Sequence, residues 1–191
     1  MIDAQAPGSE LTYEDRIPIA WRLLSEPVAA ADLAHIYEAA LTRLNAILAV
    51  GETTPQEYLE DSGARAQELV RVEARLNLLI AMVGELLAVQ RTPPAAGSVR
   101  LGGEWVEWEG TAPPAPGETV ELSLYLHPAV PDAVRLPARV EGVEASSDGP
   151  SRVHAVFPDL PMAVRSGLEK FIFRWHRRRI AEQRKAHPSP R

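Results

Sequence analysis

The chain has 191 residues, 46% of them hydrophobic, and a net charge of −6 from 20 basic and 26 acidic residues. This length suits one domain, or one domain with a large insertion. The absence of cysteine excludes disulfides, cysteine-ligated zinc, iron–sulfur clusters and thiol catalysis. The charge is uneven: residues 165–191 hold 9 basic and 2 acidic residues, net +7, and the remainder is net −13. An anionic partner would therefore meet the C-terminal end.

Neither a leader nor a membrane span is predicted. Residues 1–10 contain no apolar run, and every later apolar run is broken well before the ~18 residues that a spanning helix needs. We therefore expect a cytoplasmic protein without membrane insertion.

The first predicted element is a strand over Tyr13–Leu24. Ile17, Ile19 and Trp21 recur at every second position, which is the spacing of a half-buried strand. Pro18 cannot donate a backbone hydrogen bond, which predicts that it lies on an edge strand or at the strand's start.

Two helices are predicted next, over residues 28–50 and from Thr54 to about residue 91. Apolar residues in the first recur every three or four positions and lie on one face. The second starts with Thr54-Pro55-Gln56-Glu57, a capping-box sequence with proline at the first helical position. It would be roughly 45–55 Å long, which is long for a globular domain.

Six apolar residues of the second predicted helix are spaced 3-4-3-4-3, the heptad pattern of a coiled coil. A lone surface helix keeps a period of ~3.6, so its apolar stripe drifts by about 20° per heptad. We interpret the pattern as the seam of a bundle between chains; the alternative is a helical hairpin folded back on its own domain. The six residues are Leu69, Val72, Leu76, Leu79, Val83 and Leu86.

Between residues 95 and 158 the pattern changes to short strands, which predict a small antiparallel barrel or sandwich. Pro137 limits its strand to an edge or a bulge. Trp105 and Trp108 are three positions apart and should face opposite sides of their strand. The predicted strands are Ser98–Leu101, Glu104–Glu109, Thr119–Leu126, Val134–Val143 and Arg152–Phe157.

A last helix is predicted after Asp159, its expected cap, and beyond Trp175 arginines replace its apolar stripe. One interpretation is a solvated face whose charges complement the helix dipole. The other is an anion site, in which guanidinium groups bind phosphate and Trp175 stacks on a base. The possible anion contacts are Arg16, Arg22, Arg174, Arg177, Arg178 and Arg179.

No catalytic or metal-binding motif is present in the sequence. The five histidines include no pair with the i, i+4 spacing of a helical zinc site. A nucleophile elbow and a phosphate-binding loop are also missing. We therefore expect no enzymatic activity, no metal and no cofactor.

The arrangement resembles the PilZ domain family: an Arg-bearing first strand, a short barrel, and Val153-His154-Ala155-Val156-Phe157 leading into a terminal helix. Residues 168–179 look like the terminal helix of its atypical branch, in which an inserted heptad-bearing helix assembles four chains. The resemblance implies an α+β fold: a small antiparallel PilZ-like β-barrel with a C-terminal helix and an inserted long helical hairpin or coiled coil. Residues 1–27 would form the tail and first strand, 28–92 the insert, and 93–191 the remaining barrel and basic helix.

The PilZ family binds cyclic di-GMP through an Arg-x-x-x-Arg segment and an Asp/Asn-x-Ser-x-x-Gly turn, and both are altered here. Arg16 and Arg22 are six positions apart, and alignment on Gly110 puts Trp105 and Glu107 at the Asp/Asn and Ser positions. Glu107 would repel a phosphate. The resemblance therefore implies that standard cyclic di-GMP binding is lost.

The resulting expectation is a non-catalytic, self-associating adaptor, most simply a tetramer, in bacterial signalling or motility, with an unknown protein partner. One alternative is a cyclic di-GMP receptor with a non-standard arginine site. Another is nucleic-acid binding through the basic helix, which the net −13 of the remainder disfavours.

Overall fold

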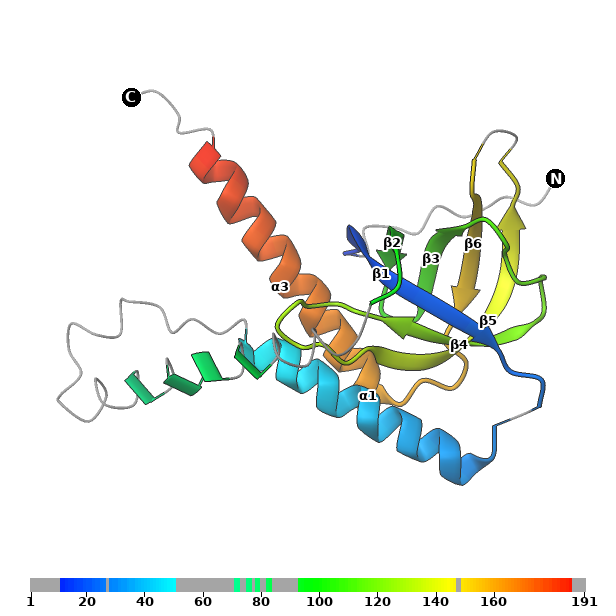
Figure 1. The fold of residues 1–191 in the computed structure, drawn as a ribbon, viewed down its shortest axis with the longest axis horizontal. Coiled ribbons are helices and arrows are strands. Elements are labelled where there is room, and N and C mark those ends of the chain that lie inside the picture. The colour runs from blue at the N-terminus through cyan, green and yellow to red at the C-terminus, as the bar shows by residue number, and fades with distance from the viewer. Residues whose placement is uncertain are drawn as a thin grey trace.

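A computed structural model describes residues 11–26, 28–50, 71–72, 75–76, 78–79, 82–83, 93–146 and 149–186. Its strands close into an antiparallel barrel in the order β1-β2-β3-β6-β5-β4. Two helices, α1 (Ala30–Val50) and α3 (Met162–Ala186), accompany the barrel, and the C-terminal half of α3 projects away from it (Figure 1). The strands are β1 (Tyr13–Leu23), β2 (Ala96–Leu101), β3 (Trp105–Gly110), β4 (Thr119–Leu124), β5 (Val134–Glu144) and β6 (Ser151–Val156).

The core of the barrel follows from period-two alternation along its strands. Val120, Leu122 and Leu124 of β4 are fully buried, whereas the residues between them are partly exposed. Successive side chains of a strand point to opposite faces, so the apolar set fills the barrel. The predicted antiparallel barrel with a C-terminal helix is confirmed.

Pro18 lies in the middle of β1, so its predicted place at an edge or a strand start was wrong. β1 pairs with β2 from Tyr13 to Pro18 and with β4 from Ile19 to Leu23. Pro18 falls where the partner changes, and its carbonyl accepts a hydrogen bond from the Tyr125 N–H at 3.2 Å. A closed barrel has no edge strand, and the changeover accommodates the missing N–H.

Pro137 lies on the half of β5 that has one neighbouring strand. It faces Glu121 of β4, and β5 pairs with β6 only from Arg139 onward. This is an edge-like position, as expected for a residue without an N–H. The irregularity of β5 falls later, between Val140 and Gly142.

Asp159 is not the cap of α3, contrary to the prediction. It lies in the preceding turn with φ of 51°, a left-handed conformation that Asp tolerates better than most residues. The N–H groups of Val164 and Arg165 donate to the Pro161 carbonyl at 2.9 and 3.0 Å. The helix therefore begins at Met162, directly after Pro161.

Helix α1 packs against α3 and β5. The two helices approach closely at Gly167, where an added Cβ would lie 3.2 Å from Leu44 Cδ1. The Tyr37 hydroxyl also donates to the Pro158 carbonyl at 3.0 Å. The apolar face of α1 is therefore buried within the chain. Its buried residues are Tyr37, Ala40, Leu44 and Ile47.

Most of the second predicted helix lies outside the described residues, including Leu69 and Leu86 of the heptad seam. The described pairs 71–72, 75–76, 78–79 and 82–83 are helical, and Figure 1 shows them beyond the C-terminal end of α1, away from the barrel. The long helical insert stays a prediction. The described seam residues are 52–58% exposed: Val72, Leu76, Leu79 and Val83.

Candidate functional site

A groove runs between the N-terminal half of β1 and α3, and we name it the β1–α3 groove. It consists of three hollows of about 430, 360 and 540 Å³. Asp15 lines all three, so they lie next to one another around this residue. Its other walls are residues 125–131, between β4 and β5, and the C-terminal end of α1. The groove therefore lies where the barrel and both helices meet.

One part of the groove is apolar. The Tyr13 ring packs against Phe171 and Trp175 of α3, with centroids 5.1 and 5.0 Å apart, and is therefore held in place. Burial, and secondarily the Asp15 carboxylate, raise the pKa of Tyr13, so its hydroxyl stays neutral. The apolar lining is Tyr13, Leu126, Pro128, Val130 and Pro131.

Three of the predicted anion contacts meet in the 540 Å³ hollow: Arg16, Arg178 and Arg179. Arg16 lies on β1, and its Nη2 donates to the Ala96 carbonyl at 3.2 Å. The Arg179 guanidinium lies 4.8 Å from the centroid of the Trp175 ring, a cation–π distance. The structure therefore brings together cations from two elements that are far apart in the sequence.

The other three predicted contacts are placed differently. Arg22 donates two 2.9 Å hydrogen bonds to Glu121, and this pairing lowers the pKa of the Glu121 carboxyl. The Arg177 guanidinium lies 6.0 Å from the Phe173 ring. Arg174 lines the 360 Å³ hollow and donates to the Leu48 carbonyl at the end of α1. Arg174 therefore joins α3 to α1 inside the groove.

Carboxylates stand beside the cations. Glu14, Asp15 and Glu182 line the same 540 Å³ hollow as Arg16 and Arg178. Like charges repel more strongly where water is partly excluded. A ligand carrying two phosphates would therefore meet repulsion as well as attraction here.

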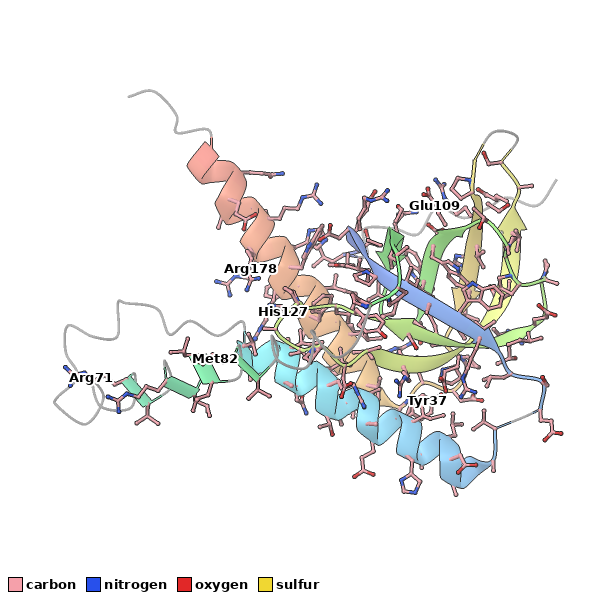
Figure 2. All side chains as sticks on the ribbon, viewed as in Figure 1. Tyr37, Arg71, Met82, Glu109, His127 and Arg178 are labelled. Carbon is pink, nitrogen blue, oxygen red and sulfur yellow. The ribbon has the colours of Figure 1, made fainter. Side chains whose placement is uncertain are left out.

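His127 contributes a neutral polar group to the groove. Burial, and secondarily the Arg178 guanidinium, lower the pKa of His127. Its Nδ1 accepts a hydrogen bond from the Ala129 N–H at 3.1 Å. Figure 2 shows the labelled His127 and Arg178 near each other, close to the end of α1.

Trp105 and Trp108 differ in burial, as expected for opposite faces of β3. Trp108 is 2% exposed inside the barrel. Trp105 is half-buried, with the Arg100 guanidinium 5.6 Å and the His154 ring 5.8 Å from its ring centroid. A Cβ on Gly102 would lie 2.3 Å from Trp105 Nε1, so the ring needs glycine there.

The stretch aligned with the family's ligand turn forms strand β3, paired with β2 and β6. Glu107 accepts a 2.6 Å hydrogen bond from Arg100 and lies 3.4 Å from His154 Nδ1. Its carboxylate is therefore engaged with cationic and titratable neighbours on the barrel surface.

Within the described residues, no cluster of three or more His, Asp or Glu side chains could hold a metal ion. The helices of that same part of the chain are too short or too polar to cross a bilayer.

A sequence model described as "Atypical PilZ domain, cyclic di-GMP receptor" matches residues 44–185. The chain belongs to the atypical PilZ domain family. A crystal structure from Xanthomonas campestris is similar, with a TM-score of 0.70 and 25% identity over 91% of this chain and 92% of that one. That protein is described as a tetrameric PilZ domain self-assembled via an unusual helical bundle. No curated protein matches this chain.

The resemblance seen in the sequence is thereby confirmed for the family and the barrel. The apolar lining of the groove was not predicted, because its members come from β1 and from the loop after β4. His127 was noted in the sequence only as a residue without a metal-binding pattern. Barrel closure places these segments together, and no local spacing in the sequence reports it.

Proposed function

We propose that this PilZ protein is a non-catalytic, self-associating adaptor in cytoplasmic signalling. The observation that carries the proposal is the exposed heptad stripe of Val72, Leu76, Leu79 and Val83 on helical residues of a single chain. Burying a side chain of this size contributes about 1.5–3 kcal/mol. Packing the stripes of several chains together would gain this energy for each residue.

The similar Xanthomonas campestris protein supports a tetramer, because it is described as self-assembled via a helical bundle. A tetramer would present several barrels to one target. Linked binding sites raise the effective concentration of each other's ligand. Multivalent binding of a clustered partner is therefore the advantage that we attribute to assembly.

The oligomeric state is tested by sedimentation velocity and light scattering at micromolar concentration. We expect four times the chain mass of 20.9 kDa. A monomer under these conditions would contradict self-association. A dimer or trimer would support self-association but contradict the tetramer.

A second candidate function is binding of cyclic di-GMP at a non-standard site. Arg16, Arg178, Arg179 and Trp175 line one hollow, which offers guanidinium groups for phosphates and a ring for a base. We rank this function second because three carboxylates line the same hollow.

Calorimetric titration separates the candidate functions. Micromolar cyclic di-GMP binding that is lost in Arg16→Ala and retained in Arg22→Ala would establish a receptor with a displaced site. A random DNA duplex, titrated in the same buffer, tests binding through the basic helix, whose affinity should fall steeply with salt. Absence of heat with both ligands favours the adaptor.

A further inference from the structure

The β1–α3 groove combines an apolar floor with cations along one wall. Tyr13 and Leu126, both largely buried, contribute to the floor. Arg174 and Arg178 of α3 stand along the opposite wall of the same hollow. Apolar side chains that are held in place favour an apolar anchor, and guanidinium groups favour carboxylates.

The charge distribution of the whole chain favours a partner segment of negative charge. Residues 174–182 of α3 carry four arginines and one glutamate, net +3, whereas residues 1–164 carry net −13. An acidic partner is repelled by most of the body and attracted to α3. Such complementarity orients an approaching partner and raises its association rate.

The charged groups inside the groove differ in how they are engaged. Asp15 accepts a hydrogen bond from the Arg16 N–H at 2.8 Å and interacts with the Tyr13 hydroxyl. Among the described residues, Arg178 has no carboxylate within ion-pair distance, although Glu182 lies one turn later on α3. Arg178 is exposed and can meet an incoming carboxylate.

We propose that the β1–α3 groove binds an extended segment of a partner protein in which an aliphatic or aromatic side chain is flanked by Asp or Glu. The apolar side chain packs on Tyr13 and Leu126, and one flanking acidic side chain faces Arg178. Glu14, Asp15 and Glu182 oppose a second buried carboxylate as they oppose a second phosphate, so the other acidic residues of the segment stay at the rim of the groove. The inference rests on the proposed adaptor function and gives the chemistry of its partner.

The groove also reaches the end of α1. Ile47 and Leu48 line it at the C-terminal end of α1, and Arg174 donates to the Leu48 carbonyl. In the sequence, the predicted second helix starts at Thr54, four residues after α1 ends at Val50. A bound segment therefore contacts the last turn of α1, shortly before the predicted second helix in the sequence.

A random-peptide display library, selected on the purified full-length protein, tests the proposal. We expect enriched sequences to share an apolar residue flanked by acidic ones, and their affinity is then measured by fluorescence anisotropy. Arg178→Glu should weaken binding about tenfold or more. Arg177→Glu is the matched control: it makes the same charge change one residue away, outside the groove, and should change affinity less than about twofold.

Three outcomes would overturn the proposal: no enrichment, enrichment of basic peptides, or equal losses of affinity in both variants.

The same titrations on Leu76→Glu/Leu79→Glu separate this inference from the proposed assembly. If that variant is monomeric and still binds the selected peptides with unchanged affinity in solution, the groove acts within one chain. Loss of binding with retained assembly defeats the groove proposal alone. An unmodified protein that is monomeric but binds the selected peptides would contradict the proposed function and leave the groove proposal intact.

Discussion

Val120, Leu122 and Leu124 of the barrel have no exposed surface, whereas Leu76 and Leu79 of the insert are 55% and 58% exposed. Both sets consist of aliphatic residues in regular structure. The barrel buries its apolar side chains within one chain, because its strands close around them. The insert leaves its apolar side chains to be covered by something else. If the proposed assembly forms, fold and assembly are specified by separate stretches of the sequence.

Helix α1 lies between these two regions in the sequence and belongs with the barrel by its packing. Tyr37 and Leu44 are buried against the rest of the chain, and Gly167 lets α3 approach. The division of the chain at residues 27/28 and 92/93 stays a prediction. The packing nevertheless indicates that deletion of residues 51–92 would remove fewer core residues than deletion of residues 28–92.

The largest effect is expected from Leu76→Glu combined with Leu79→Glu. Charged side chains at seam positions cannot be buried without a large desolvation cost. The assembly should dissociate into monomers, measured by sedimentation, while the strand signal in circular dichroism is unchanged. Arg71→Glu, off the heptad seam, should keep the parental mass. A double variant that remains assembled would remove the seam from the interface.

A substitution at the packed contact between α1 and α3 should lower the stability of the fold and leave the assembly intact. Leu44→Ala removes a fully buried side chain at the contact between α1 and α3. We expect the free energy of unfolding to fall by about 2–5 kcal/mol, with unchanged mass in native buffer. Urea denaturation measures this loss directly when Leu44→Ala is added to the Leu76→Glu/Leu79→Glu variant, which is expected to be monomeric. The exposed His35 on the same helix is the control, and His35→Ala should cost less than ~0.5 kcal/mol.

The groove should make stability depend on pH through His127. Its pKa is lowered in the folded protein, so the unfolded chain takes up the proton first as the pH falls below the ordinary value of 6.5. Stability therefore decreases with falling pH in this window and is greater above it. The other charged groups that line the same hollow are Asp15, Arg174, Arg178 and Glu182.

Thermal denaturation of wild type and His127→Asn at neutral pH and about one pH unit below 6.5 tests this dependence. Asparagine keeps an acceptor for the Ala129 N–H but does not titrate. The variant should lose less stability than wild type on acidification. Equal losses would exclude His127 as the cause.

The smallest effect is expected from Arg22→Ala on the barrel surface. The Arg22–Glu121 pair is bidentate, but the Arg22 side chain is 69% exposed. Exposed ion pairs contribute about 0.2–1 kcal/mol and are screened by salt. Urea denaturation should show a loss within this range that shrinks at high salt. A larger loss that is independent of salt would indicate a packing role for Arg22.

Features with a local pattern could be predicted from the sequence. The alternation of Val120, Leu122 and Leu124 predicted β4, and the spacing of Val164 and Leu168 predicted the buried face of α3. Both depend only on the period of one element.

Features that depend on closure could not be predicted. Pro18 was assigned to an edge because the change of partner along β1, from β2 to β4, is a property of the whole barrel. The groove joins Tyr13, His127 and Trp175, which are far apart in the sequence. Asp159 was assigned as a cap because Asp favours both caps and left-handed turns.

The closed barrel has a consequence for how chains can come together. An open sheet at the high local concentration of an assembly would expose unpaired N–H and C=O groups, which invite edge-to-edge pairing and aggregation. Here β1 and β4 pair with each other and complete the ring. Among the described residues, backbone with a neighbour on one side only is confined to short stretches such as the Pro137 half of β5, so the barrel offers no long edge for strand addition by a neighbouring chain. Several copies can be held close together without their sheets merging into a fibril.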